Sequence, residues 1–477
     1  MDTNRAAENR PENENETAAA GQAGLTRHQR YAVLIGILGS FYPGFAGSAL
    51  NLAIPQMGVD FGMGAAAVGW IVTVYMLGVA ATVVPFGKLA DTTGRRRILI
   101  MGTSIFFATS VLAIFATKGW MILAVRSLQG IGSAMNMATC MPIAISQMPA
   151  NRRGWAIGTV TGGVYAGLAL GPALGGFLTS AFSWRGIFVF TALLSAVALF
   201  AAIRGVKKDI PEKGLDQFDL PGNILFLLSI GAVIYGLTAF NQNIAGKIAL
   251  AAGFVLLVIF ISAERKAHDP MMDLSLFKDP IFTLSNLTAL FNYAGTFAIG
   301  YMASIYLQVI DGYSARTAGL LLITQPVFMT LLSPVMGRLS DRVTPYKLAA
   351  LGQTVCAGAL LVFVFLRPHT SVAVVVIALA LAGIGVAMFS PPNTNIIMGC
   401  VPPYRFGIAN SVLSTMRTVG QSAGMAVITL VVSAVVGNVS LFEAESAALL
   451  RTFHLAFIVF CALNAAGIFM SLKRRNV

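Results

Sequence analysis

Long apolar runs separated by short polar stretches repeat along the whole chain. An α-helix needs about 20 apolar residues to cross a bilayer, and fourteen runs approach that length. The runs are continuously apolar, whereas strands of a transmembrane barrel would alternate. They predict helices over 30–56, 66–89, 97–117, 120–143, 154–181, 185–203, 219–240, 246–264, 281–309, 316–337, 346–366, 371–399, 406–434 and 452–472.

Composition supports an all-α polytopic membrane protein. Hydrophobic residues make up 56% of the chain and charged residues only 11%, against about 25% charged in soluble domains. The net charge of +13 comes from short basic clusters at the ends of apolar runs, which argues against a nucleic-acid partner. The cysteines form no CxxC pair, so we expect buried thiols, no metal site and no cofactor.

Lys and Arg are distributed unevenly between the two sides of the predicted bundle. With the N-terminus inside, 24 of the 32 bases lie in inner segments and six in outer ones; Arg126 and Arg417 fall within spans. Membrane proteins keep such an excess on the cytoplasmic side. We therefore expect a multi-pass protein of the cytoplasmic membrane, with lipid as its surroundings and both termini in the cytoplasm.

Two segments recur at nearly one spacing. "GKLADTTGRRRIL" at 87–99 aligns with "GRLSDRVTPYKLA" at 337–349, an offset of 250, and "RRGWA" at 152–156 aligns with "RFGIA" at 405–409, an offset of 253. Such echoes indicate two parallel halves of six helices. The remaining pair of runs lies between the halves, where it either mediates dimers or fills a gap; we expect a monomer.

The repeat and the polar segments predict the domain boundaries. The polar start of the chain lacks the apolar run of a signal peptide and predicts a disordered cytoplasmic tail. "FDLPG" at 218–222 has an acid followed by Pro, as at a helix start. The expected units are a tail at 1–29, a six-helix bundle at 30–203, a linker with two extra helices at 204–264, a six-helix bundle at 265–472 and a tail at 473–477.

Three motifs and the central helix pair resemble the major facilitator superfamily, specifically its fourteen-helix drug:proton antiporter branch. "GKLADTTGRRR" at 87–97 is similar to the family's loop between its second and third helices. "RSLQGIGSA" at 126–134 resembles the fourth-helix motif, and "GLALGPALGG" at 167–176 resembles the fifth-helix signature of exporters. The resemblance covers nearly everything from residue 30 on, and implies two rocking six-helix bundles.

The loop motif contains candidate gating residues. Gly87 and Gly94 permit tight backbone turns, and Asp91 can pair with Arg95 or with a neighbouring helix dipole. The resemblance implies that this contact latches the cytoplasmic gate in the outward-facing state; the alternative is a loop that only anchors topology. The second copy keeps Asp341 without the second glycine and is a weaker latch candidate.

Small residues on the predicted fifth helix form a smooth face. Close helix approach favours such residues, and a proline allows bending. The functional interpretation is a hinge at the interface of the two halves, and the alternative is tight packing without motion. The hinge candidates are Gly167, Gly171, Pro172, Gly175 and Gly176.

Two polar stripes lie on otherwise apolar helices and face a water-filled cavity or a neighbouring helix. The stripes are Arg126, Gln129, Ser133 and Asn136, and Asn410, Ser414, Arg417 and Gln421. The resemblance suggests that Arg126, together with Asp91, takes part in proton coupling, with snorkelling as the alternative for Arg126. Arg417 is the deepest charge and favours an anion, substrate dipole or coupling contact; the alternative is an arginine capped by the carbonyls of a broken helix. The cavity candidates are Asn51, Tyr75, Asn136, Asn292, Tyr293, Gln325 and Arg417.

One expected acid is missing. Relatives of this branch usually carry an acid in the first helix, and Ala46 stands at that position. A buried carboxylate would be the natural proton carrier and partner for a cationic drug. The substrate is then neutral or anionic, or the proton uses Asp91, Asp60 or a histidine such as His454, or transport is uncoupled. A packing role is the simpler account of His454.

These features together predict a secondary exporter of small amphiphilic compounds or drugs, working by alternating access and exchanging substrate for protons. The alternatives are an exporter of an anionic or neutral metabolite and a non-transporting sensor with the same fold. No P-loop, HExxH motif or nucleophile set occurs, so we expect no enzyme activity.

Overall fold

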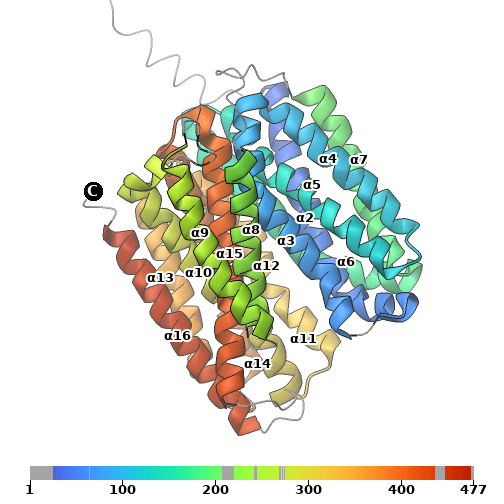
Figure 1. Ribbon diagram of the computed structural model, residues 1–477. Helices are drawn as coiled ribbons and strands as arrows, with labels where there is room; N and C mark the ends of the chain where they lie inside the picture. Colours follow the sequence, from blue (N-terminus) through green and yellow to red (C-terminus); the bar gives the residue numbers. More distant parts are fainter. Residues whose placement is uncertain are drawn as a thin grey trace, which may run out of the picture.

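The protein is a bundle of long helices that run roughly parallel to one another (Figure 1). The computed structural model describes residues 25–63, 65–206, 220–240, 244–267, 270, 272, 274–435 and 446–473. Its α-helices are α2 (Arg27–Phe61), α3 (Ala65–Thr93), α4 (Arg95–Ile114), α5 (Gly119–Ser146), α6 (Arg153–Phe182), α7 (Arg185–Gly205), α8 (Leu220–Ala239), α9 (Ile244–Glu264), α10 (Pro280–Ile305), α11 (Ala315–Leu322), α12 (Thr324–Ser340), α13 (Pro345–Val364), α14 (Val372–Gly399), α15 (Phe406–Val435) and α16 (Ser446–Lys473).

Each predicted apolar run coincides with a helix, except that 316–337 is divided between α11 and α12. Within the described ranges, eleven helices are long and apolar enough to cross a membrane. The count of fourteen spans therefore stays a prediction. The expected tail at 1–29 is wrong at its end because α2 already begins at Arg27; residues 1–24, 207–219 and 474–477 of the expected tails and linker lie outside the described residues.

Local chemistry explains where several helices begin. Thr26 caps α2, accepting from the Gln29 backbone amide while the Gln29 side chain accepts from the Thr26 amide, a reciprocal arrangement typical of helix starts. Asp279 caps α10, accepting from the amide of Ile281 at 2.7 Å, and Pro280 follows where its missing N–H costs nothing.

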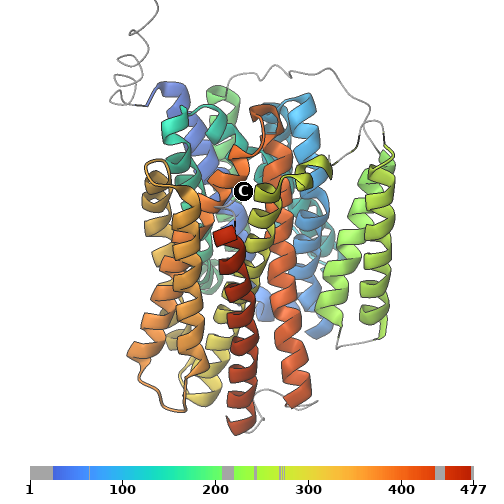
Figure 2. The same ribbon diagram turned by 90° about the vertical axis from the view of Figure 1, so that its left-hand side faces the viewer.

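The helices form two groups with a peripheral pair beside them. Helices α2–α7 pack among themselves, as do α10–α16, and the groups meet where α6 contacts α12 and where α15 contacts α3 and α5. The pair α8 and α9 packs against α3 and α15, and Figure 2 shows it at the edge of the bundle. Large side chains on α9 are exposed, among them Ile248 at 63% and Val258 at 63%, as expected beside lipid.

The hydrophobic clusters differ between the two ends of the molecule. One large cluster joins both groups, with Val83 of α3 and Ile157 of α6 in one group and Phe389 and Val412 in the other. Toward the opposite end, one cluster contains only α10–α16 residues and another only residues of the first group. The groups are thus packed together at one end, called here the latch end, where α3 meets α4 and α15 begins.

Candidate functional site: the latch end and the buried arginines

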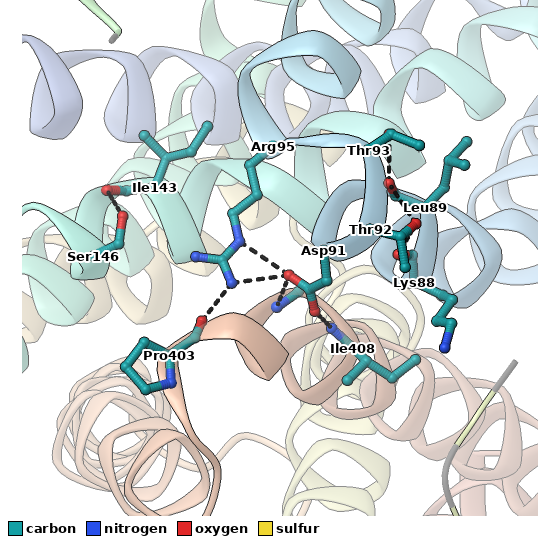
Figure 3. Close-up of polar contacts among 11 residues, drawn as sticks. Lys88, Leu89, Asp91, Thr92, Thr93, Arg95, Ile143, Ser146, Pro403 and Ile408 are labelled. Atoms are coloured by element: carbon teal, nitrogen blue, oxygen red, sulfur yellow. Dashed lines mark hydrogen bonds and ion pairs between the residues drawn. The ribbon is translucent and has the colours of Figure 1, made fainter. Parts of the chain in front are cut away.

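Asp91 lies at the end of α3 and caps the first turn of α15 in the other helix group (Figure 3). Its Oδ1 accepts from the Gly407 amide at 3.1 Å and its Oδ2 from the Ile408 amide at 2.9 Å. First-turn amides have no acceptor within their own helix, and the positive helix end favours a carboxylate. The expected contact between Asp91 and a helix dipole is confirmed, and the helix is α15.

Arg95 completes this contact from the start of α4. Its Nη2 donates to Asp91 Oδ1 at 2.9 Å and also to the carbonyl oxygen of Pro403 (Figure 3). The side chains of Asp91 and Arg95 are only 9% and 11% exposed. Hydrogen bonds to charged groups contribute about 1.5–3 kcal/mol each when shielded from water, so Asp91 and Arg95 together stabilise the contact between the groups.

The two glycines of the motif have different structural roles. Gly94 links α3 to α4 at φ +101°, a conformation that side chains disfavour, so the predicted turn there is confirmed. The predicted turn at Gly87 is wrong because this residue lies inside α3. A Cβ on Gly87 would collide with Ser411, so glycine is required there for the close approach of α15.

Asp341 makes the corresponding contact in the opposite direction. It follows α12 of the second group and accepts from the amides of Gly154 at 2.6 Å and Trp155 at 2.9 Å, in the first turn of α6. No arginine joins it in the described ion pairs. Burial raises the pKa of the Asp341 carboxyl above its usual range, and the amide hydrogen bonds from Trp155 and Gly154 act against that rise.

Close backbone contact between α6 and α12 reinforces the latch end. A Cβ on Gly158 would collide with the Ser333 carbonyl oxygen, and one on Gly337 with the Gly154 carbonyl oxygen. Substitution at either position would therefore separate the helices. The sequence did not reveal Gly154, Gly158 and Gly337 as interface residues, although Gly154 lies in the internal echo "RRGWA".

The glycines proposed as a hinge pack within one group. A Cβ on Gly167 would meet Phe41, one on Gly171 would meet Ser48, and one on Gly175 would meet Ala49, and all three contacted residues lie on α2. Their expected position at the interface of the halves is therefore corrected to the α2–α6 contact. Pro172 lies inside α6, which continues unbroken, and Gly176 is half-buried.

Arg126 of α5 is fully buried in the first group. Its Nη1 donates to Gln129 at 2.6 Å, its Nε donates to the Ile71 carbonyl at 3.2 Å, and its guanidinium lies 4.1 Å from the centre of the Tyr75 ring. Gln129 in turn donates to Ser110 at 2.9 Å. The stripe thus faces neighbouring helices, and snorkelling of Arg126 is excluded.

The candidate cavity residues do not all lie together. Asn136 is fully buried in the first group and accepts from Thr103 at 2.9 Å, so its assignment to a cavity is wrong for this conformation. Asn292 is also fully buried, with neither amide atom hydrogen-bonded. Gln325 is 9% exposed, and the side chain of Asn51 lies outside the described residues.

Tyr293 and Arg417 lie beside each other, and the Tyr293 hydroxyl is at mid-helix where both groups meet. This hydroxyl lies 3.4 Å from that of Tyr165 on α6 and 2.8 Å from Ser390 Oγ on α14. The Arg417 guanidinium lies 4.9 Å from the centre of the Tyr293 ring. Tyr165 and Ser390, which sequence reasoning did not select, gave no signal beyond being polar residues in apolar runs.

The position of the missing first-helix acid and the two remaining proton-carrier candidates all pack against neighbouring residues. Ala46 packs with Tyr42, Phe106 and Ala198 inside the first group, so an acid there would face that core. Asp60 accepts a hydrogen bond from the Trp184 indole at 2.8 Å, and its side chain is 37% exposed. His454 contacts the Leu366 carbonyl at 3.0 Å, which fits a packing role.

The sequence profile of the Major Facilitator Superfamily matches residues 36–264 and 285–476. The chain belongs to this superfamily. It is accordingly a multi-pass membrane transporter of small molecules, with the all-helical fold expected from the sequence, and not an enzyme.

Relatives and solved structures agree with this placement. The chain is 31% identical over 402 residues to the "Riboflavin transporter RibZ" of Clostridioides difficile (strain 630), covering 83% of this chain and 87% of that protein. It is 29% identical over 415 residues to the "Multidrug resistance protein Stp" of Mycobacterium tuberculosis (strain ATCC 25618 / H37Rv), covering 86% and 77%. The proton:xylose symporter XylE superposes with a TM-score of 0.68 at 13% identity, covering 94% of this chain and 95% of that one.

Proposed function

We propose that the protein exports small amphiphilic compounds from the cytoplasm by alternating access. The observation that carries this proposal is the pair of reciprocal caps, in which Asp91 binds α15 and Asp341 binds α6. Both contacts join the two helix groups at one end, whereas the hydrophobic clusters at the other end stay separate. Rocking of the groups would break the caps and expose a central site from the opposite side.

We place the latch end on the cytoplasmic side because most Lys and Arg residues lie there. The conformation is then outward-facing, and Gly87, Asp91, Gly94, Arg95 and Asp341 form the cytoplasmic gate. The moving units are 30–203 and 265–472, and the chain is a monomer in the cell membrane with both termini in the cytoplasm. The fourteen-helix drug:proton antiporter branch is the group to which we assign it.

We further propose that inward proton movement drives export, with Arg126 and Asp91 as coupling residues. Arg126 has a buried Nη2 without a hydrogen-bond partner, so its guanidinium has a donor available for a further acceptor. Asp91 is nearly buried between two groups that must separate, and protonation would weaken its interactions with the α15 amides.

Relatives named as multidrug proteins, including the "Multidrug efflux pump LfrA" of Mycolicibacterium smegmatis (strain ATCC 700084 / mc(2)155), support a drug-like cargo.

An exporter of a neutral or anionic metabolite is the second candidate. It is favoured by Ala46 in place of an acid and by the position of Arg417 beside Tyr293. The relative named as a riboflavin transporter supports it as well. A sensor that does not transport is the third.

Efflux measured in vesicles tests these candidates. Ethidium and an anionic dye are followed in inverted vesicles containing the purified protein, with an imposed pH gradient. Gradient-driven ethidium movement that Asp91→Asn reduces supports the antiporter. Transport of the anionic dye alone supports the metabolite exporter, and no flux of either dye refutes export of both cargo classes.

A further inference from the structure

Arg417 lies deep in α15 with part of its hydrogen-bonding capacity unused. The residue is eleven positions from the start of the helix at Phe406, about 16 Å at 1.5 Å per residue, near the middle of a hydrocarbon core about 30 Å thick. Its Nε is buried and has no hydrogen-bond partner, while the residue as a whole is partly exposed. A charged donor at this depth is costly unless an anion or acceptor satisfies it.

No described carboxylate fills that role. In the described part of the chain, ion pairs join Asp91 to Arg95 and Asp60 to Arg185. Each described acid has a partner elsewhere in the fold, and these acids are Asp60, Asp91, Glu264, Asp279, Asp311 and Asp341. Among the described residues, the Arg417 guanidinium therefore lies against the face of the Tyr293 ring without a carboxylate partner.

A chain of hydroxyl groups runs beside this guanidinium. Tyr165, Tyr293 and Ser390 are 3%, 5% and 3% exposed, and their hydroxyls connect in that order at 3.4 and 2.8 Å. Each hydroxyl both donates and accepts, so the chain can turn a proton toward a nearby anion. Tyr165 belongs to the first helix group and the others to the second, so the site spans the two groups.

We infer that Arg417, with Tyr165, Tyr293 and Ser390, forms a binding site for the carboxylate of an amphiphilic substrate. A guanidinium and a carboxylate match as planar, charge-assisted hydrogen-bonding groups, and the tyrosine rings provide flat apolar walls for an aromatic body. This inference rests on the proposed transport function and adds organic monoanions to the cargo of that function. A bound carboxylate would also compete with the contact between Tyr165 and Tyr293, linking occupancy to separation of the groups.

A pair of fluorescent probes tests the site. Dansylglycine and its uncharged amide differ only in the carboxylate, and each is titrated against the purified full-length protein. We expect the wild-type protein to bind the carboxylate at least about tenfold more tightly. Arg417→Ala should weaken carboxylate binding about 10- to 100-fold, the range for one hydrogen bond to a charged group, and leave amide binding unchanged.

Matched variants separate the site from general effects of charge and folding. Arg451→Ala removes the same charge from an exposed position of α16 and should bind both probes as the wild type does. Arg417→Lys keeps the charge without the Nε donor and should fall between wild type and Arg417→Ala. Tyr165→Phe should weaken carboxylate binding by about three- to tenfold, as expected for one neutral hydroxyl.

Several results would overturn the inference. These are equal binding of the two probes by the wild type, no binding of either, or full carboxylate affinity in Arg417→Ala. If Arg417→Ala elutes as an aggregate, Arg417→Lys and Tyr165→Phe decide the question. Binding requires neither a gradient nor turnover, so a protein that binds dansylglycine but moves no dye contradicts the proposed function alone. Ethidium efflux without carboxylate binding contradicts the anion site alone.

Discussion

Asp91 and Asp341 occupy equivalent positions in the two halves, and each caps a helix of the opposite half. Asp91 binds the amides of Gly407 and Ile408, and Asp341 binds those of Gly154 and Trp155. The carboxylates are 250 residues apart, and the capped segments are 253 apart. Both internal echoes therefore meet in space, and each echo supplies one partner of each cap.

Substitution of Asp91 should release the first turn of α15. Without the carboxylate, the amides of Gly407 and Ile408 lose their acceptor, and we expect Asp91→Ala to speed hydrogen exchange there by about 10- to 100-fold. Mass spectrometry of a peptide containing these residues provides the measurement. A peptide from the middle of α13 is the internal control, and unchanged exchange at α15 would contradict the latch.

Asp341→Ala should have a smaller effect at the other cap. Asp341 has no arginine partner among the described ion pairs and is partly exposed, so solvent screens its contribution. We expect exchange at Gly154 and Trp155 to rise by less than tenfold.

The two variants together test whether the caps are coupled, because both caps close the same interface. In the double variant, the change in the free energy of opening should differ from the sum of the two single changes. Additive effects would show that the caps act independently.

A methyl group on Gly158 should open the contact between α6 and α12. Its Cβ would collide with the Ser333 carbonyl, and overpacking typically costs about 1–3 kcal/mol. We expect Gly158→Ala to lower the melting temperature and to speed exchange at both caps. Gly358→Ala is the matched control, because nothing lies within 4 Å of its added Cβ. Equal melting temperatures for the two variants would refute the close-contact argument.

Arg126→Gln should remove most pH-gradient-driven efflux, and Arg126→Lys should not restore it. A single ammonium cannot donate to both Gln129 and the Ile71 carbonyl in the geometry that the guanidinium uses. Both variants should lose most pH-gradient-driven ethidium efflux, whereas Lys118→Gln, in an exposed position, should retain it. Full efflux in Arg126→Lys would show that positive charge alone suffices there.

The sequence predicts much of the fold because each long run of apolar residues marks the position of a helix that can cross a membrane. The same reasoning located Asp91 at a helix end and placed Arg126 and Arg417 on polar stripes. It could not say which helix Asp91 would cap, because the pairing of helices depends on tertiary packing. The glycines of α6 show this limit, because Gly158 faces α12 and Gly167 faces α2. Their spacing places them on different sides of the helix but does not say which helix each side contacts.

The capped amides also make the latch end sensitive to water activity. When the groups separate, two carboxylates and the amides of residues 154, 155, 407 and 408 lose their partners together, and water must replace them because buried polar groups are costly when unsatisfied. Opening therefore takes up solvent. Excluded osmolytes such as sucrose favour states that expose less surface, so osmotic stress should slow opening of the latch end.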